Sequence, residues 1–335
     1  MNIDLPLICA LIIAFAIFAY VVLDGFDLGI GILYPLAVDD NERDTMMNSV
    51  APVWDGNETW LVLGGGGLLA AFPLAYATLL PALYGPIIAM LLGLIFRGVA
   101  FEFRYKASPV RRWIWDYSFF AGSLVATLCQ GLALGAFLQG IKIEGRGYAG
   151  GWFDWLTPFS VTTAVAMVAG YALLGATWLV WKTEGEIQQA NRLRADLLAS
   201  IVLTFIGVVS LWSPFLHPDI HVRWLSWPNT PLLAPIPLLV IGVFLALWRA
   251  LKSGPDGRPF LLSLALFALS YFGLAISTLP FVVPRHLTIW DAAAPRDSLA
   301  FLLVGAAVLL PIVLAYTGYA YWVFRGKVTG REDYH

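Results

Sequence analysis

The chain has 335 residues, of which 59% are hydrophobic and only 13% are charged. Because soluble globular proteins carry about 25% charged residues, this composition excludes an ordinary water-soluble fold. The net charge of −2 gives no indication of nucleic-acid binding. The apolar runs are continuous and do not alternate with polar residues, which favours membrane-spanning helices over a β-barrel.

The lengths of the apolar runs predict an all-α membrane protein of about nine transmembrane helices, because one crossing needs roughly 20 apolar residues. We expect two helical bundles plus a peripheral helix, and a single integral membrane domain over residues 1–335. The first run is expected to be a retained helix and not a cleaved leader, because it is too long for a signal-peptide core. The expected spans are 5–36, 59–76, 78–103, 116–141, 157–181, 197–216, 232–251, 259–283 and 299–325.

Two segments between the predicted spans have expected structures of their own. The segment 56–104 is too long for one crossing, so we expect a tight hairpin at its polar break between Pro73 and Pro81. The polar loop 182–196 is expected to be a solvated connector, with a short amphipathic helix as the alternative.

The distribution of basic residues predicts the orientation. Fourteen of the 20 Lys and Arg residues lie after odd-numbered spans, five lie after even-numbered spans, and Arg97 lies within the third span. The richer side is cytoplasmic by the positive-inside rule. The N-terminus is therefore expected on the periplasmic side and the C-terminus in the cytoplasm.

Six ionisable residues at membrane depth are candidate functional groups, because such residues cost roughly 2.5–3.5 kcal/mol each on insertion scales. They are Asp24 and Asp27 in LDGFDLGIG, Asp55 and Glu58 in APVWDGNETW, and Arg97 and Glu102 in FRGVAFEFR. The predicted topology places all six at a similar depth on the cytoplasmic side, which is compatible with a proton-conducting cluster. The alternative is a structural ion-pair network of Asp24, Asp55 and Arg97, with Glu58 and Glu102 solvated at the interface.

Glycine pairs indicate close helix packing. Gly25 and Gly29 are spaced as GxxxG, as are Gly131 and Gly135, and such pairs let helices approach closely in lipid. The run 64–67 contains four glycines, which predicts close packing or, alternatively, room for a small apolar molecule.

The histidines do not predict a haem site in this chain. The four are His217, His221, His286 and His335, at outer span ends or at the C-terminus. Membrane haem needs an axial ligand, usually His, Met or Cys. No metal site is expected from His217 and His221, because Pro218 between them argues against a helix there.

Five segments, in order, carry a resemblance to subunit II of cytochrome bd-type quinol oxidases, and the short outer loops and GNETW resemble the cyanide-insensitive branch. The segments are VLDGFDLGIGIL, NSVAPVWDGNETWLVLGGG, LIFRGVAFEFRYK, LPFVVPRHLTIWDA and LLPIVLAYTGYAYWVFRGKVT. They span nearly the whole chain at matching spacing.

The resemblance implies a haem-free subunit of a respiratory oxidase in the bacterial inner membrane that oxidises quinol and reduces oxygen to water. It implies a partner, subunit I, carrying haems b558, b595 and d, and in some members a third small single-helix subunit. It further implies a proton path at Asp27 and Asp55, with Arg97 and Glu102 beside them. A structural quinone is associated with the motif of Trp54, and oxygen entry with the region of Trp60.

A proton-coupled secondary transporter is the alternative from another class, because such transporters also bury carboxylates among helices. A purely structural membrane anchor is the third hypothesis. The one-sided placement of the acids and the absence of a convincing inverted repeat oppose the transporter.

Overall fold

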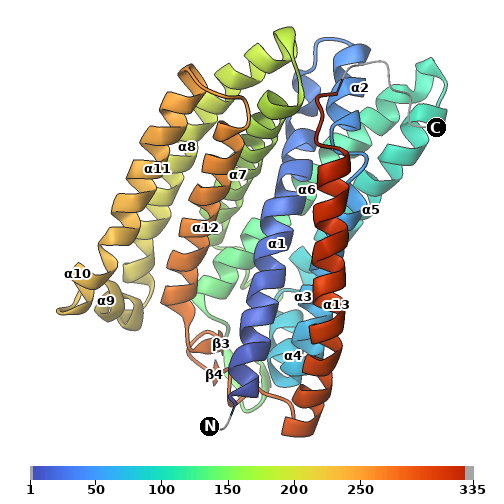
Figure 1. Cartoon of the computed structure of the whole chain (residues 1–335). Coiled ribbons are helices and arrows are strands. Elements are labelled where there is room, and N and C mark those ends of the chain that lie inside the picture. The colour runs from blue at the N-terminus through green and yellow to red at the C-terminus, as the bar shows by residue number, and fades with distance from the viewer. Residues whose placement is uncertain (1–2, 329–335) are drawn as a thin grey trace.

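The computed structural model describes residues 3–328, and most of that length is helical (Figure 1). The long helices are α1 (Leu5–Leu33), α3 (Trp54–Ala71), α5 (Tyr84–Lys106), α6 (Arg112–Gln139), α7 (Pro158–Lys182), α8 (Gly185–Leu216), α11 (Pro235–Lys252), α12 (Arg258–Thr278) and α13 (Arg296–Val323). The all-α membrane class predicted from composition is confirmed.

Short elements connect the long helices. The helical ones are η1 (Tyr34–Leu36), α2 (Asp40–Asn48), α4 (Pro73–Ala82), η2 (Pro109–Arg111), α9 (Pro218–Leu225) and α10 (Asn229–Leu233). Two antiparallel hairpins pair β1 (Ile143–Glu144) with β2 (Gly147–Tyr148), and β3 (Phe281–Val283) with β4 (Leu287–Thr288).

Local sequence explains where several helices begin. The Asp4 side chain accepts a hydrogen bond from the backbone N–H of Leu7 and so caps α1. A capping box of Thr157 and Ser160 starts α7, with Pro158 at its first position. These residues satisfy backbone N–H groups that a helix start leaves unpaired, which matters most where lipid cannot replace them.

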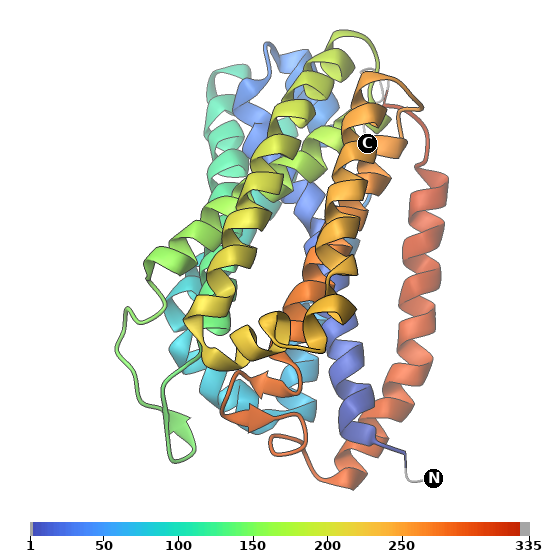
Figure 2. The same cartoon turned by 90° about the vertical axis from the view of Figure 1, so that its left-hand side faces the viewer.

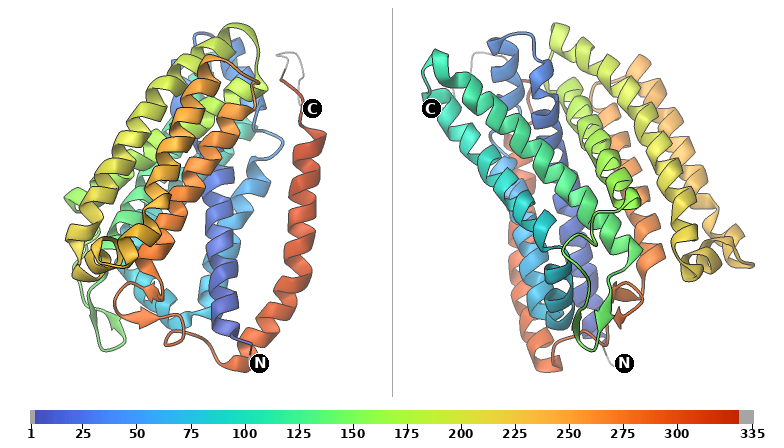
Figure 3. Two further views of the ribbon diagram at one scale, coloured as in Figure 1. Left: turned by 60° about the vertical axis from the view of Figure 1, so that its left-hand side comes forward. Right: turned by 180° about the vertical axis from the view of Figure 1, so that it is seen from behind.

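The helices form two groups and one outlying helix (Figures 2 and 3). One group contains α1, α3, α5 and α6, and the other contains α7, α8, α11 and α12. The groups join where α7 packs against both α1 and α6. Helix α13 lies outside α1 and α3 and is the most exposed of the long helices.

Glycines set the close approach at this junction. A Cβ on Gly29 would lie 1.8 Å from the carbonyl oxygen of Tyr171, and one on Gly131 would lie 2.4 Å from Cα of Ala164. Both GxxxG pairs predicted from the sequence therefore pack against α7. The four-glycine run differs from these pairs. Gly64 and Gly67 face α1, whereas a Cβ on Gly65 or Gly66 would meet no other described atom within 4 Å.

Two predicted connections are wrong. Residues 182–196 do not form a solvated connector, because α8 starts at Gly185 and continues without a break into the next span. The tight hairpin between Pro73 and Pro81 is instead the separate helix α4. Pro73 can begin this helix because its missing N–H is not needed in a first turn.

The predicted span 259–283 ends earlier, at Thr278, shortly before the chain enters β3.

Eight helices within residues 3–328 are long and apolar enough to cross a membrane. The ninth predicted span, 59–76, corresponds to α3, which has 18 residues and polar first turns. Because α1 and α13 both run from the lower to the upper end in Figure 1, the chain as described starts and ends at opposite ends of the bundle.

Hydrogen bonds show which connections share an end of the bundle. At one end, Lys182 of α7 donates to the carbonyl oxygens of Phe324 and Gly326, and Asp256 accepts from Arg192 (2.6 Å) and Lys327 (2.7 Å). The hydrogen bond from Lys327 lowers the pKa of Asp256, with a further contribution from Arg192. The basic connections after the fifth, seventh and ninth predicted spans therefore lie together. At the opposite end, Trp290 donates to Asp4 (3.0 Å).

The orientation leads to a first prediction. Reporter tags fused to the two termini of the full chain should report opposite sides of the membrane, with the C-terminal tag in the cytoplasm, because the basic connections cluster at the end where α13 finishes. Accessibility of each tag in intact cells and in inverted vesicles measures this. Two tags on one side would contradict an odd number of crossings.

Candidate functional site

A buried arginine bridges two carboxylates on different helices. Arg97 of α5 donates from Nη1 to Asp24 of α1 (2.5 Å) and from Nη2 to Glu58 of α3 (2.6 Å). The Arg97 and Asp24 side chains are fully buried, whereas the Glu58 side chain is 29% exposed. The ion pair considered from the sequence, between Asp55 and Arg97, is not formed, because Glu58 takes that place one helical turn later.

Asp27 lies one helical turn beyond Asp24 on α1, and its hydrogen-bond partner is neutral. It is fully buried, and its Oδ2 accepts a hydrogen bond from Nδ2 of Asn57 (2.8 Å). The Oδ1 of Asn57 accepts in turn from the hydroxyl of Tyr321 on α13 (2.8 Å). Sequence reasoning missed Asn57 and Tyr321; a lone amide within the GNETW motif was the available signal.

A second group of polar residues missed from the sequence lies beside Asp24. Tyr171 of α7 donates to Oε1 of Gln130 on α6 (2.7 Å), and Nε2 of Gln130 donates to the hydroxyl of Tyr20 on α1 (2.7 Å). Asp24 lies one turn further along the same helix as Tyr20. Gln130 is a polar residue within an otherwise apolar stretch of α6, which is the signal that could have found it.

Two of the predicted acids lie outside this cluster. Asp55 is exposed at the start of α3. Glu102 is 69% exposed and contacts Lys106 at 3.4 Å. Of the six ionisable residues expected at one depth, four lie inside the bundle, namely Asp24, Asp27, Glu58 and Arg97. The two outer acids lie on the neighbouring surface of α3 and α5.

The two tryptophans proposed as ligand contacts differ in their surroundings. Trp54 stacks on Phe101 with ring centroids 4.8 Å apart and lies 5.9 Å from the guanidinium of Arg97. Trp60 is 1% exposed, meets Phe15 edge-on at 5.6 Å, and its indole N–H has no hydrogen-bond partner in the described structure. Trp54 therefore covers the charged cluster, whereas Trp60 lies in apolar packing.

A further charged cluster lies nearer the basic end of the bundle. Arg104 of α5 is 1% exposed and pairs with Asp116 of α6 (2.5 Å) and with Asp44 of α2. Between it and Arg97, Phe101 and Phe119 meet edge-on at 5.1 Å, and both are buried. This aromatic layer separates the two charged clusters along α5 and α6.

Several buried polar atoms of the Arg97 cluster lack a partner within the described residues. They include Oδ2 of Asp24, Oδ1 of Asp27 and Nε of Arg97. Buried carboxyl oxygens without partners have a high free-energy cost unless protons or water molecules satisfy them. The arrangement therefore suits groups that bind and release protons better than a fully paired structural network does.

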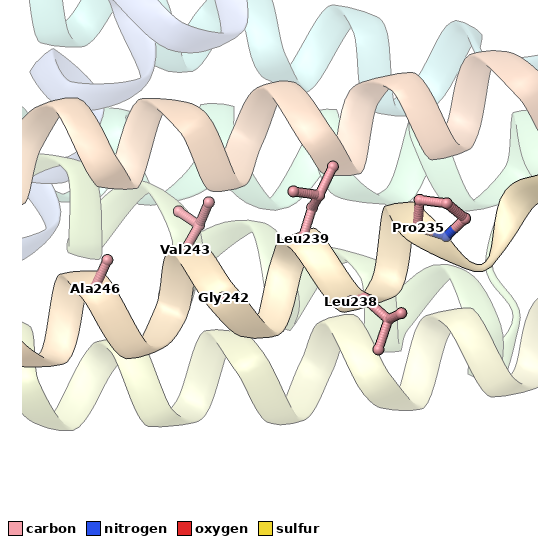
Figure 4. A pocket seen from close by; sticks show the side chains of 6 residues that line it. All are labelled: Pro235, Leu238, Leu239, Gly242, Val243 and Ala246. Atoms are coloured by element: carbon pink, nitrogen blue, oxygen red, sulfur yellow. The ribbon is translucent and has the colours of Figure 1, made fainter.

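The pockets are apolar and lie away from the charges. One, along α11, is lined by Pro235, Leu238, Leu239, Gly242, Val243 and Ala246 (Figure 4). A narrower one between α1, α3 and α13 includes Cys9, Gly67 and Leu303. No group of three or more His, Cys, Asp and Glu side chains that could hold a metal ion occurs within residues 3–328.

The fold and the buried cluster define a multi-pass helical membrane protein with ionisable groups concentrated on α1, α3 and α5. The sequence profile of the family described as cytochrome bd terminal oxidase subunit II matches residues 5–324, and the chain belongs to this family. It is accordingly a subunit of a terminal quinol oxidase, an oxidoreductase complex with a subunit I partner. The transporter alternative is not supported.

Individual relatives agree along the whole length. The chain is 34% identical to the cytochrome bd-I ubiquinol oxidase subunit 2 of Escherichia coli (strain K12), covering 96% of this chain and 94% of the relative. It is 28% identical to the cytochrome bd ubiquinol oxidase subunit 2 of Bacillus subtilis, covering 96% of each. A chain in the structure of bd oxidase from Geobacillus thermodenitrificans has the same fold, with a TM-score of 0.77, 16% identity, and coverage of 96% and 99%.

Removing the central cation should be costly. Arg97→Gln leaves the buried Asp24 and the partly exposed Glu58 without their counter-charge, and breaking a buried ion pair from one side costs roughly 3–5 kcal/mol. We expect a strongly lowered thermal stability of the purified complex. Arg97→Lys keeps the charge but should restore only part of this stability, because lysine lacks the planar fork that reaches both acids.

The matched control is Arg43→Gln, which removes a partly exposed pair with Asp40. Exposed pairs contribute about 0–1 kcal/mol, so its melting temperature should stay near that of the wild type. Equal melting temperatures for the two variants would contradict a central role for Arg97 in stability.

Proposed function

We propose that this chain conducts protons from the cytoplasmic side of the bacterial inner membrane to its partner subunit, for the reduction of oxygen to water. The observation that carries the proposal is the composition of the buried cluster. The guanidinium of Arg97 contacts the carboxyl groups of Asp24 and Glu58 across α1, α3 and α5, and the buried carboxyl group of Asp27 lies one turn beyond Asp24 on α1. Such a cluster is neutral only when some of its carboxyl groups are protonated, so it can hold exchangeable protons.

The surface beside the cluster supports a handover to the partner. Asp55 and Glu102 are exposed on α3 and α5, and Gly65 and Gly66 leave the backbone of α3 open. Exposed acids and a bare glycine run are poorly suited to lipid, and they suit a neighbouring protein that packs closely. In this proposal subunit I covers this face, and protons pass between the partly exposed Glu58 and the outer Asp55.

The other groups of the complex follow from the family. The partner would carry haems b558, b595 and d, which supply electron transfer and the reduction of oxygen. Trp54 and Trp60 remain candidates for contacts with a structural quinone or an oxygen channel. A third, single-helix subunit is also part of the proposal, with quinol as the substrate of subunit I.

The proton path makes a direct prediction. Asn matches Asp in size but has no exchangeable carboxyl proton, so Asp27→Asn or Asp55→Asn in the intact complex should lower steady-state oxygen consumption by roughly tenfold or more. The haem content of the proposed partner subunit should stay near normal, and reduction of those haems by quinol should be less affected than turnover. Oxygen uptake and visible spectra measure the two effects.

Asp40→Asn is the control, because this exposed acid pairs only with Arg43 within the described structure. It should leave turnover unchanged. If Asp27 and Asp55 are merely structural, their variants should lose assembly and haem together. Full activity with full haem content would rule out a required role for either acid.

The distribution of cofactors is tested separately. Expressed and purified without its partner, the chain should contain no stoichiometric haem, because the histidines of the described region lie in connections and not within the long helices. His217 follows α8, His221 lies in the short α9 and His286 lies between β3 and β4, whereas His335 lies outside the described residues. His217, for example, contacts the backbone carbonyl of Gln139 at 2.7 Å. A visible haem spectrum from the isolated chain would contradict the assignment.

A further inference from the structure

Helix α11 has an apolar notch on its exposed side. The helix packs on α8 and α12, and it lies on the opposite side of the molecule from α5 and α13 (Figures 1 and 3). The notch is the hollow between Pro235 and Ala246 that Figure 4 shows. A Cβ on Gly242 would meet no other described atom within 4 Å, whereas Leu238 and Leu239, one turn earlier, are 66% and 54% exposed. The missing side chain of the glycine therefore leaves a gap between larger apolar residues.

The notch leads to the basic end of the helix. Gly242, Ala246 and Arg249 are spaced by four and three residues, so they lie along one stripe of α11. The helix advances about 16 Å between Leu238 and Arg249. The hydrocarbon part of one membrane leaflet is about 15 Å thick. The stripe therefore matches the depth that one acyl chain covers when its headgroup lies beside Arg249.

Three basic side chains at this end have no acidic partner within the described part of the chain. Arg249 and Lys252 are exposed on the last turn of α11, and Arg258 is exposed at the start of α12. The acid in the connection between these helices, Asp256, is already paired with basic side chains of α8 and of the C-terminal segment. This end of α11 therefore carries positive charge that is not compensated.

Two contacts favour a negatively charged group at this end. Nζ of Lys252 lies 3.5 Å from the ring centroid of Trp248, and tryptophan is typical of the boundary between acyl chains and headgroups. Arg192 of α8 donates from Nη1 to the carbonyl oxygens of Ala250 (3.5 Å) and Leu251 (3.2 Å). These carbonyls belong to the negative end of the helix dipole, so the arginine reduces their repulsion of an anion.

We propose that the notch and the basic end of α11 bind one anionic phospholipid of the cytoplasmic leaflet. An acyl chain fills the stripe from Leu238 to Ala246, and the phosphate lies between Arg249 and Lys252, with Arg258 beside them. Basic side chains next to an apolar surface at the cytoplasmic side recognise anionic lipid headgroups in this way. The inference does not depend on the proton path, because none of these residues belongs to the Arg97 cluster.

The charges favour a lipid over a transmembrane helix of a partner. Gly242 and Ala246 are small residues four apart, and such a pair also suits close packing of a second helix. That helix would leave the basic end of α11 without a counter-charge unless it carried acids at the same depth. An anionic phospholipid has the apolar chain and the negative charge in one molecule, so it matches both parts of the site.

The test is native mass spectrometry of the intact oxidase complex titrated with phosphatidylglycerol, with phosphatidylcholine of the same acyl chains as the neutral probe. Arg249→Gln combined with Lys252→Gln should weaken the tightest phosphatidylglycerol site by roughly tenfold or more, and should leave binding of phosphatidylcholine near that of the wild type. Gly242→Leu should also weaken phosphatidylglycerol binding, because its Cβ enters open space and the new side chain occupies the notch.

Each change has a matched control. Lys106→Gln removes another exposed cation, at the end of α5, where the side chain contacts Glu102 at 3.4 Å. Gly207→Leu adds the same side chain on α8 at a glycine that does not line the notch, and where a Cβ also finds open space. Both controls should bind phosphatidylglycerol as the wild type does.

The inference requires that the charge variant and the notch variant both lose affinity while both controls keep it. Unchanged phosphatidylglycerol binding in either variant would overturn it. An equal loss in Lys106→Gln would also overturn it, because the general surface charge and not this site would then bind the lipid. Release of a protein chain from the complex by Gly242→Leu would show that the notch docks a helix, and the inference would be wrong.

Discussion

The two ion pairs of Arg97 are the interaction on which the rest of the site depends. They join α1, α3 and α5 at one depth, where burial of a lone guanidinium or a lone carboxylate would carry a high free-energy cost. A hydrophobic replacement would solve the burial problem at lower cost, which makes this charged cluster a candidate functional site. The excess of carboxyl groups over cations is the basis of the proposed proton path.

The aromatic layer of Phe101 and Phe119 gives this site a direction. It separates Arg97 from the cluster of Arg104, Asp44 and Asp116, although both arginines lie on α5. Trp54 closes the cluster on another side by stacking on Phe101. The cluster therefore reaches the protein surface at the partly exposed Glu58 on α3, beside the outer acids. It does not reach the surface along the interior between α5 and α6.

The cluster is closely packed on the side of α7 and open on the side of α3. On the side of α7, glycines bring backbones into direct contact, and Tyr171 and Gln130 reach Tyr20 through short hydrogen bonds. On the side of α3, the glycine run is half open and the acids are exposed. Close packing toward α7 and an open surface on α3 suit the proposed exchange of protons with a neighbouring subunit.

The sequence by itself determined the membrane class and the approximate spans. It also gave six candidate residues, four of which form the buried cluster, because apolar length and buried charge are local properties of a chain in lipid. It could not show that Glu58, and not Asp55, pairs with Arg97, since both lie on α3 and only its rotation selects between them. It missed Tyr20, Asn57, Gln130, Tyr171 and Tyr321, which are ordinary residues in span sequences. Their role arises only because five helices bring their polar atoms within hydrogen-bonding distance, and that proximity is decided by tertiary packing.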